Sequence, residues 1–266
     1  MTVAKVHHLN CGTMAPPGHQ FKRLLPARLV AHVLLVETAD RLILVDTGFG
    51  TADVKQHAGR LSRPLAAALG ARLDASECAV NQVSDLGHDP ADVTDVVLTH
   101  MDLDHAGGLS DFPGARVHLS SAELHAATHP TLREKPRYVE AQWAHGPDWV
   151  SHDLDASGES WHGFTALSAI GDDVVMIALA GHTRGHTGVA VSTATGWLLH
   201  AGDAYFAAGD TAQPRQCPPG LKAFQRMMAV DNAKRRDNLA RLSELRASGG
   251  ATIFSAHDAQ EFAALS

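Results

Sequence analysis

Short runs of apolar and β-branched residues recur along the chain and predict buried strands. The clearest are Val30 to Thr38 and Leu42 to Val45, joined by a turn at Ala39-Asp40. Continuous apolar runs of this length are typical of strands that are covered on both faces. Similar runs predict further strands at Val3 to Leu9, Asp95 to Thr99, Ala115 to Leu119, Val174 to Leu179, Gly188 to Ser192, Trp197 to His200 and Thr252 to Ser255.

Helical patterns separate these strands. Thr51 to Pro90 is expected to be helical with breaks, with a turn at Pro90-Ala91-Asp92. The residues Ser120 to Glu123 have the form of a capping box that opens a short helix. Leu221 to Ala247 carries apolar residues mostly three or four positions apart, as one face of a helix does. Strands that alternate with helices indicate an α/β fold, and no linker divides the chain, so we expect one domain over residues 1–266.

The least regular part of the sequence lies between Pro130 and Trp161. It contains three prolines and three of the four tryptophans. Loops often carry specificity, so one interpretation is that this insertion, at about 130–161, forms part of a pocket wall. The alternative is a surface segment whose aromatic side chains fill a small core or make the contact of a homodimer.

The densest group of side chains that can bind metal follows one of the predicted strands. Val96-Val97-Leu98 leads into a loop that ends at Gly107-Gly108 and contains His100, Asp102, Asp104 and His105. At the end of a strand, this spacing lets imidazole and carboxylate groups converge on one divalent ion. The alternative is a solvated polar loop.

The pattern His-x-Asp-x-Asp-His at residues 100–105 resembles the signature of the metallo-β-lactamase superfamily, His-x-His-x-Asp-His, with Asp102 in place of the second histidine. Later motifs follow in the family's order: Gly181-His182-Thr183, Gly202-Asp203 and Ala256-His257-Asp258. Val45-Asp46-Thr47-Gly48 resembles the family's first motif, whose aspartate orients metal ligands; a common turn is the alternative. The resemblance implies a four-layer αββα sandwich.

The resemblance also implies a binuclear metal site. Its first ion would be held by His100, Asp102 and His182, its second by Asp104, His105 and His257, and Asp203 would bridge the two. Two divalent ions, zinc first, would hold a bridging hydroxide as the nucleophile, because coordination can lower the pKa of water from 15.7 to about 7. Asp104 and Asp203 are therefore expected to be catalytic as well as ligating.

Asp102 changes the charge of the expected site. With histidine there, two divalent ions, two carboxylates and one hydroxide sum to +1; a coordinated Asp102 brings the sum to zero. Oxygen ligands also favour harder ions such as manganese or iron. Because aspartate is shorter than histidine, it could fail to reach the ion, which would leave the first site weak or empty.

Three further residues near these motifs have open roles. Tyr205 is a candidate for donating a hydrogen bond to a developing oxyanion, with a packing role as the alternative. His186 is expected to support the ligands and not to bind metal. Asp258 could relay a proton to the leaving group or cap a turn.

Composition excludes several classes of protein. The 266 residues are 45% hydrophobic and 19% charged, which is ordinary for a soluble globular protein. The net charge is −7 and the only dense basic run is Lys234 to Arg236, so we expect no nucleic-acid partner. The sequence shows no signal peptide and no run of about 18 apolar residues, so we expect no membrane association and a cytoplasmic location. Cys11, Cys78 and Cys217 are expected to be free thiols.

The leading functional hypothesis is a metal-dependent hydrolase of a small ester-like substrate, with a lactone as the first choice. The Gly-His-Thr-x-Gly-His pattern at residues 181–186 resembles the lactonase branch of the superfamily. A glyoxalase II-like thioester hydrolase uses the same ligands and is the first alternative. Asp102 favours a further alternative, an iron-dependent oxidoreductase of the same fold. A metal-binding protein without turnover is disfavoured by the nearly complete ligand set.

Overall fold

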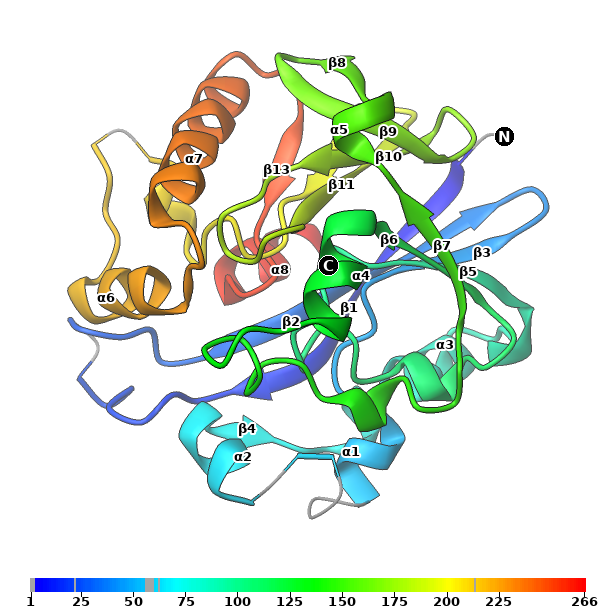
Figure 1. Ribbon diagram of the computed structural model, residues 1–266, viewed down its shortest axis with the longest axis horizontal. Helices are drawn as coiled ribbons and strands as arrows, with labels where there is room; N and C mark the ends of the chain where they lie inside the picture. Colours follow the sequence, from blue (N-terminus) through cyan, green and yellow to red (C-terminus); the bar gives the residue numbers. More distant parts are fainter. Residues whose placement is uncertain (1–2, 22, 56–59, 62, 213) are drawn as a thin grey trace.

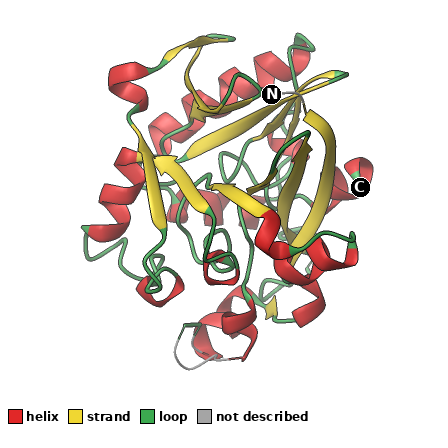
Figure 2. Cartoon of the chain, turned by 90° about the vertical axis from the view of Figure 1, so that its right-hand side faces the viewer, coloured by secondary structure: helices red, strands yellow, loops and turns green. Residues whose placement is uncertain are grey.

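Two β-sheets form the centre of the fold and pack face to face (Figures 1 and 2). The computed structural model describes residues 3–21, 23–55, 60–61, 63–212 and 214–266. In spatial order, the first sheet contains β4 (Ala71–Arg72), β1 (Val3–Met14), β2 (Leu29–Thr38), β3 (Leu42–Val45), β5 (Val93–Val97), β6 (Arg116–Ser120) and β7 (Asp148–His152). The second contains β13 (Thr252–Phe254), β12 (Gly196–His200), β11 (Thr187–Thr193), β10 (Val174–Ala178), β9 (Phe164–Ile170) and β8 (Glu159–Trp161).

Helices flank the strands on both sides (Figure 2). The α-helices are α1 (Thr51–Lys55), α2 (Arg63–Leu69), α3 (Ala79–Asp85), α4 (Ser121–Thr128), α5 (Leu154–Ser157), α6 (Pro219–Met228), α7 (Asn232–Ala247) and α8 (Ala259–Leu265). Short 3-10 helices occupy Ala75–Glu77, Pro90–Asp92, Leu109–Asp111, Glu140–Gln142 and Ala208–Asp210. No helix of the described chain is long and apolar enough to cross a membrane.

Side chains alternate between the two faces of each strand, so the apolar residues form three core layers. In β2, Leu34 and Val36 point between the sheets and pack in one cluster with Met176 of β10. Their neighbours Val33 and Leu35 point to the opposite face, where the cluster includes residues of α3 and α4. Successive side chains of a strand alternate between faces, which explains this division. The outer face of the second sheet packs against α7. The expected αββα sandwich is confirmed.

The predicted strands are mostly confirmed, with shifted ends. β3 has the predicted bounds and β2 begins one residue early. β1 continues to Met14, past the predicted end at Leu9. β5 ends at Val97, two residues before the predicted end, because the backbone N–H of Thr99 donates to the Asp46 carboxylate and leaves the sheet ladder. Cys11, Cys78 and Cys217 are free, as expected.

Other predictions need correction. The helical region from Leu221 to Ala247 is two helices, because the Asp231 side chain accepts the N–H groups of Ala233 and Lys234 and starts α7 anew. The segment 130–161 is less irregular than expected, since β7 and β8 extend the edges of the two sheets. β9 and α8 were not predicted. Part of the helical prediction over Thr51 to Pro90, residues 56–59 and 62, lies outside the described chain.

The capping box at Ser120 forms only in part. The Ser120 hydroxyl accepts the N–H of Glu123, as expected for the start of α4. The Glu123 side chain does not return the bond; it is fully buried and turns toward the loops that carry Met101 and Gly185. This residue therefore joins two parts of the chain that are distant in sequence.

The ends of strands from both sheets gather the candidate ligands. β3 and β5 run parallel and end before Asp46 and His100, and the parallel strands β12 and β13 end before Asp203 and His257. The loop after β10 carries His182. Because the carboxyl ends of parallel strands meet at one edge of a sheet, these residues are brought to the same end of the sandwich.

His8 of β1, His32 of β2 and His200 of β12 lie next to one another, with His32 and His200 buried, and they predict acid sensitivity of the fold. Burial, followed by the proximity of His200 and His8, lowers the pKa of His32 from 6.5 to about 2. The folded state therefore binds fewer protons than the unfolded state between these values, so the free energy of unfolding falls as the pH drops below 6.5. One such proton contributes at most about 1.4 kcal/mol per pH unit.

We expect the free energy of unfolding, measured in urea, to fall less between pH 7.5 and pH 5.0 in His32→Phe than in the wild type. The centroid of the buried His32 ring lies 4.3 Å from that of Phe254, so an aromatic replacement keeps this ring contact. His19→Phe, at an exposed histidine, is the control and should keep the wild-type decrease. An equal decrease in all three proteins would show that His32 does not carry the effect.

Candidate metal centre

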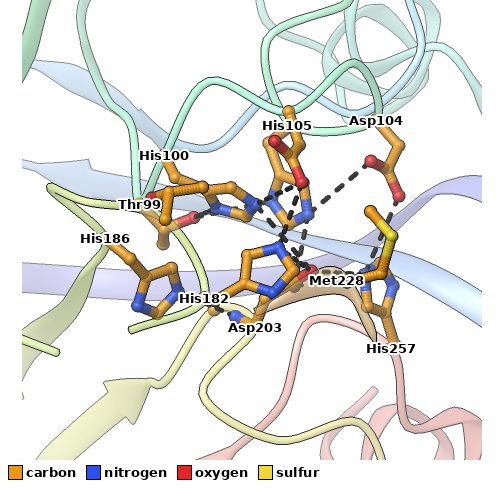
Figure 3. Close-up of polar contacts among 12 residues, drawn as sticks. Thr99, His100, Asp104, His105, His182, His186, Asp203, Met228 and His257 are labelled. Atoms are coloured by element: carbon orange, nitrogen blue, oxygen red, sulfur yellow. Dashed lines mark hydrogen bonds and ion pairs between the residues drawn. The ribbon is translucent and has the colours of Figure 1, made fainter. Parts of the chain in front are cut away.

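All seven residues predicted as metal ligands lie together in two adjoining clusters. Figure 3 labels each of them except Asp102. In each cluster, the potential ligand atoms are within 4.8 Å of one another. The members of the first cluster are His100, Asp102, His182 and Asp203, and those of the second are Asp104, His105 and His257. All are buried except Asp104, whose side chain is 14% exposed, so the centre reaches solvent at Asp104.

The Asp203 carboxylate lies between the two clusters. Its Oδ1 atom is 3.3 Å from His105 Nε2 and 3.1 Å from His257 Nε2. Its Oδ2 atom is 3.3 Å from His182 Nε2 and 3.8 Å from His100 Nε2. Oδ2 also lies 3.1 Å from His257 Nε2, so the one carboxylate contacts ring nitrogens of both clusters, as a bridging ligand must.

Several buried atoms at this centre have no hydrogen-bond partner among the described residues. They include His100 Nε2, His105 Nε2 and Asp203 Oδ1. A buried polar atom without a partner costs about 1–3 kcal/mol, so native proteins rarely leave several together. Imidazole nitrogens and carboxylate oxygens are donors that suit zinc, manganese and iron. The residues therefore fit a pair of divalent ions.

In His100, His105 and His257 the opposite ring nitrogen is anchored, which fixes the direction of Nε2, whereas His182 Nδ1 has no hydrogen-bond partner among the described residues. His105 Nδ1 donates to Asp46 Oδ2 over 2.8 Å, and His257 Nδ1 donates to the Val30 carbonyl over 2.8 Å. His100 Nδ1 lies 3.0 Å from the Thr99 hydroxyl. Such anchors set the tautomer and orientation of metal-binding histidines.

Asp46 occupies a backbone conformation that few residues adopt. Its φ is 61°, in the left-handed region where Asp and Asn are among the better tolerated residues. From there, its carboxylate accepts the N–H and the hydroxyl of Thr99 as well as the His105 ring. The Val-Asp-Thr-Gly motif thus contacts the centre through His105 and is more than a turn.

Carboxylates and imidazoles shift each other's pKa in this centre. Burial lowers the pKa of His105, but the charges of Asp203, Asp46 and Asp104 outweigh it and raise that pKa well above its usual value. Burial raises the pKa of Asp203, but His257, His105 and His182 hold it well below its usual value. A divalent ion would compete with protons for these nitrogens.

His186 supports Asp203 from behind. Its Nε2 accepts the Asp203 backbone N–H over 2.9 Å, and its Nδ1 donates to the Leu179 carbonyl over 3.1 Å. Burial, with His100 and His182 nearby, lowers its pKa well below the usual value, so the ring is neutral. Both ring nitrogens are already used, which agrees with the expected supporting role.

Asp102 reaches the first cluster despite its short side chain. Its Oδ2 atom lies 3.0 Å from His182 Nε2 and 3.5 Å from His100 Nε2. Its Oδ1 atom forms an ion pair with Arg137, 3.1 Å from Nε. Burial raises the pKa of Asp102, but Arg137 and His100 outweigh it, and the carboxyl stays ionised.

Sequence reasoning missed Arg137 and Glu123. Arg137 comes from the 130–161 segment, which supplies a residue to the wall of the centre as one interpretation expected. The tryptophans Trp143, Trp149 and Trp161 instead pack against the cores, as the alternative expected. The one sequence signal for Arg137 is the extra negative charge of Asp102, which needs a cation nearby.

Two candidate catalytic residues lie elsewhere. Tyr205 is fully buried, and its hydroxyl contacts Glu261 at 3.0 Å and Arg246 at 2.7 Å. This placement favours the packing role for Tyr205 that the sequence left as the alternative. Asp258 caps α8 by accepting the N–H groups of Gln260 and Glu261, which favours its structural alternative.

Comparisons with known proteins agree with this geometry. A family model described as the metallo-beta-lactamase superfamily matches residues 27–257. A probable metallo-hydrolase of Mycobacterium tuberculosis is 44% identical over 260 residues, which are 96% of this chain and 80% of the relative. An N-acyl homoserine lactonase of Azorhizobium caulinodans is 30% identical over 190 residues, 68% of this chain and 64% of the relative.

Solved structures share the fold at low sequence identity. An N-acyl homoserine lactone hydrolase, with its product bound at the catalytic metal centre, superposes with a TM-score of 0.74 and 20% identity, covering 99% of this chain and 97% of that chain. A dizinc quorum-quenching lactonase superposes with a TM-score of 0.64 and 17% identity, covering 97% and 90%. At these identities the likeness shows the fold alone.

Replacing Asp46 with Asn tests its support of the centre. Asn tolerates the same backbone conformation, but its amide group offers one acceptor oxygen where three donors converge. We expect Asp46→Asn to weaken zinc binding about 10- to 100-fold, measured by competition with a chromogenic chelator. Asp40→Asn, in the exposed turn between β2 and β3, is the control. Unchanged zinc affinity in Asp46→Asn would contradict this role.

Removing the Tyr205 hydroxyl separates packing from catalysis. Because that hydroxyl contacts Glu261 and Arg246, we expect Tyr205→Phe to lower the free energy of unfolding by about 1–3 kcal/mol. Metal content and kcat for hydrolysis should stay at the wild-type values. A large loss of kcat at full metal content would restore Tyr205 as a catalytic candidate.

Proposed function

Because the chain belongs to the metallo-beta-lactamase superfamily, we propose that it hydrolyses the ester bond of a small lactone. The chain is a hydrolase of lactonase-like type within this superfamily. The observation that carries the proposal is the Asp203 carboxylate placed between two clusters of histidine and carboxylate ligands. The lactonases among its relatives and structural neighbours support lactones as the substrate class.

We assign the metal ligands to the same residues that the sequence led us to expect. His100, Asp102 and His182 would hold one ion, Asp104, His105 and His257 the other, and Asp203 both. Bound ions would lower the pKa of a coordinated water and polarise the substrate carbonyl. Zinc is the first choice, with manganese or iron favoured by the oxygen donor of Asp102.

In this reaction, side chains of the protein orient the metal ligands and accept a proton. The Asp46, Thr99 and Val30 contacts keep the ring nitrogens directed at the centre. Asp104, the most exposed member, lies where a substrate can approach, and its carboxylate can accept the proton of the attacking water. That proton then passes to the leaving oxygen, so water and lactone give one hydroxy acid.

Replacing Asp203 with Ala tests the proposal. Without the carboxylate that both clusters share, we expect kcat/KM for N-acyl homoserine lactones and simple γ-lactones to fall at least about 100-fold. Asp237→Ala, at an exposed position of α7, is the matched control and should keep wild-type turnover. Unchanged turnover in Asp203→Ala would contradict the shared-ligand assignment.

The same assay distinguishes other reactions of the fold. Thioesters and an oxygen electrode are included with the lactones, using protein whose metal content is known. Faster turnover of thioesters would move the substrate class to a glyoxalase II-like reaction. Oxygen consumption by iron-loaded protein, without hydrolysis, would favour an oxidoreductase.

A further inference from the structure

Asp102, the position at which this chain departs from the family signature, is paired with a buried arginine. The side chains of Asp102 and Arg137 are 8% and 7% exposed, and Arg137 Nε lies 3.1 Å from Asp102 Oδ1. In a site shielded from water, a guanidinium carries its charge permanently. The carboxylate thus has a fixed positive partner at Oδ1, and the same guanidinium also reaches the first cluster, since Arg137 Nη2 lies 3.5 Å from His182 Nε2.

Arg137 is held firmly in this position. Its Nη1 donates to the His182 carbonyl over 2.9 Å and its Nη2 to the Met228 carbonyl over 3.2 Å. The next residue, Tyr138, donates its hydroxyl to Glu123, which also accepts the Met101 N–H. The guanidinium is therefore anchored to the loops that carry Asp102 and His182, and it cannot swing away without breaking these bonds.

The two oxygens of Asp102 have separate surroundings. Oδ1 faces Arg137, whereas Oδ2 faces the His100 and His182 nitrogens of the first cluster. This division leaves one oxygen free to bind an ion while the other stays paired with the cation. Arg137 thereby fixes which oxygen is offered to the first site.

We propose that Asp102 and Arg137 act together as one neutral ligand unit that replaces the usual histidine. Asp102 alone would lower the charge of the centre by one relative to histidine, and Arg137 restores it. Arg137 is thus a positioning residue for the first metal site, an inference that rests on the ligand assignment under the proposed function. It also explains why the carboxylate at this position need not produce a weaker centre.

The proposal makes an unusual prediction for Asp102→His. Although this change restores the family signature, it leaves the Arg137 charge unpaired beside the incoming ion. We expect zinc to fall from about two ions to about one per chain, with at least about a 10-fold weaker first site. In Asp102→His combined with Arg137→Met, the charge is removed and zinc should return to about two ions per chain.

Two control variants test whether zinc binding depends on the charge of residue 137, on the size of its side chain, or on the mere presence of a second substitution. Asp102→His with Arg137→Lys keeps the cation in a shorter side chain and should stay near one ion. Asp102→His with Arg133→Met should also stay near one, because Arg133 donates to the carbonyls of Met227 and Ala229 and not to Asp102. Zinc is counted by elemental analysis of the full-length chain after loading and dialysis, and circular dichroism checks that each variant is folded.

The zinc content of these variants decides whether Asp102 and Arg137 act as a neutral unit. Two ions in Asp102→His alone, or no gain in the variant that also carries Arg137→Met, overturns the neutral unit. If zinc also returns to about two ions per chain in Asp102→His with Arg137→Lys, the size of the side chain and not its charge limits the site. That result overturns the proposal too. Because the readout is metal content, a wild type with two ions but no lactone turnover refutes only the substrate. A wild type that binds no zinc, manganese or iron refutes both.

Discussion

The Asp203 carboxylate is the group on which the arrangement of this end of the molecule depends. Histidines from loops of both sheets point their Nε2 atoms at its two oxygens, at distances from 3.1 to 3.8 Å. Groups buried this deeply are stable only when their charges are balanced. The sandwich makes the balance possible because parallel strands of each sheet end at the same edge, and His186 fixes Asp203 from behind.

Glu123 shows how local structure gives way to this requirement. The Ser-x-x-Glu pattern at the start of α4 would stabilise the helix most as a reciprocal capping box. The side chain instead accepts the N–H groups of Met101 and Gly185 and the hydroxyl of Thr183. These partners lie beside His100, Asp102, His182 and His186 in sequence. A carboxylate on a helix thus joins the loop after β5 to the loop after β10, and the helix keeps only half of its cap.

Much of this could be predicted from the sequence, because the signals were local. Apolar runs gave β2 and β3, and the motifs named the seven residues that the fold gathers. Long-range choices could not be predicted in the same way. Tyr205 lies two residues from Asp203, yet its hydroxyl turns to Glu261 in α8, a helix that the pattern did not indicate. β9 was missed because its residues alternate weakly, and its neighbours in the sheet decide its conformation.

The partner of Asp102 illustrates the same limit more sharply. A motif records which residue types stand at fixed spacing, whereas a buried charge is balanced by whatever lies beside it in space. Arg137 is 35 positions away in a segment without regular pattern, and only the folded chain places its guanidinium next to Oδ1. A carboxylate in place of a histidine therefore need not signal a damaged site. The property that the centre must conserve is its total charge and the direction of one donor atom, and a pair of distant residues can conserve both.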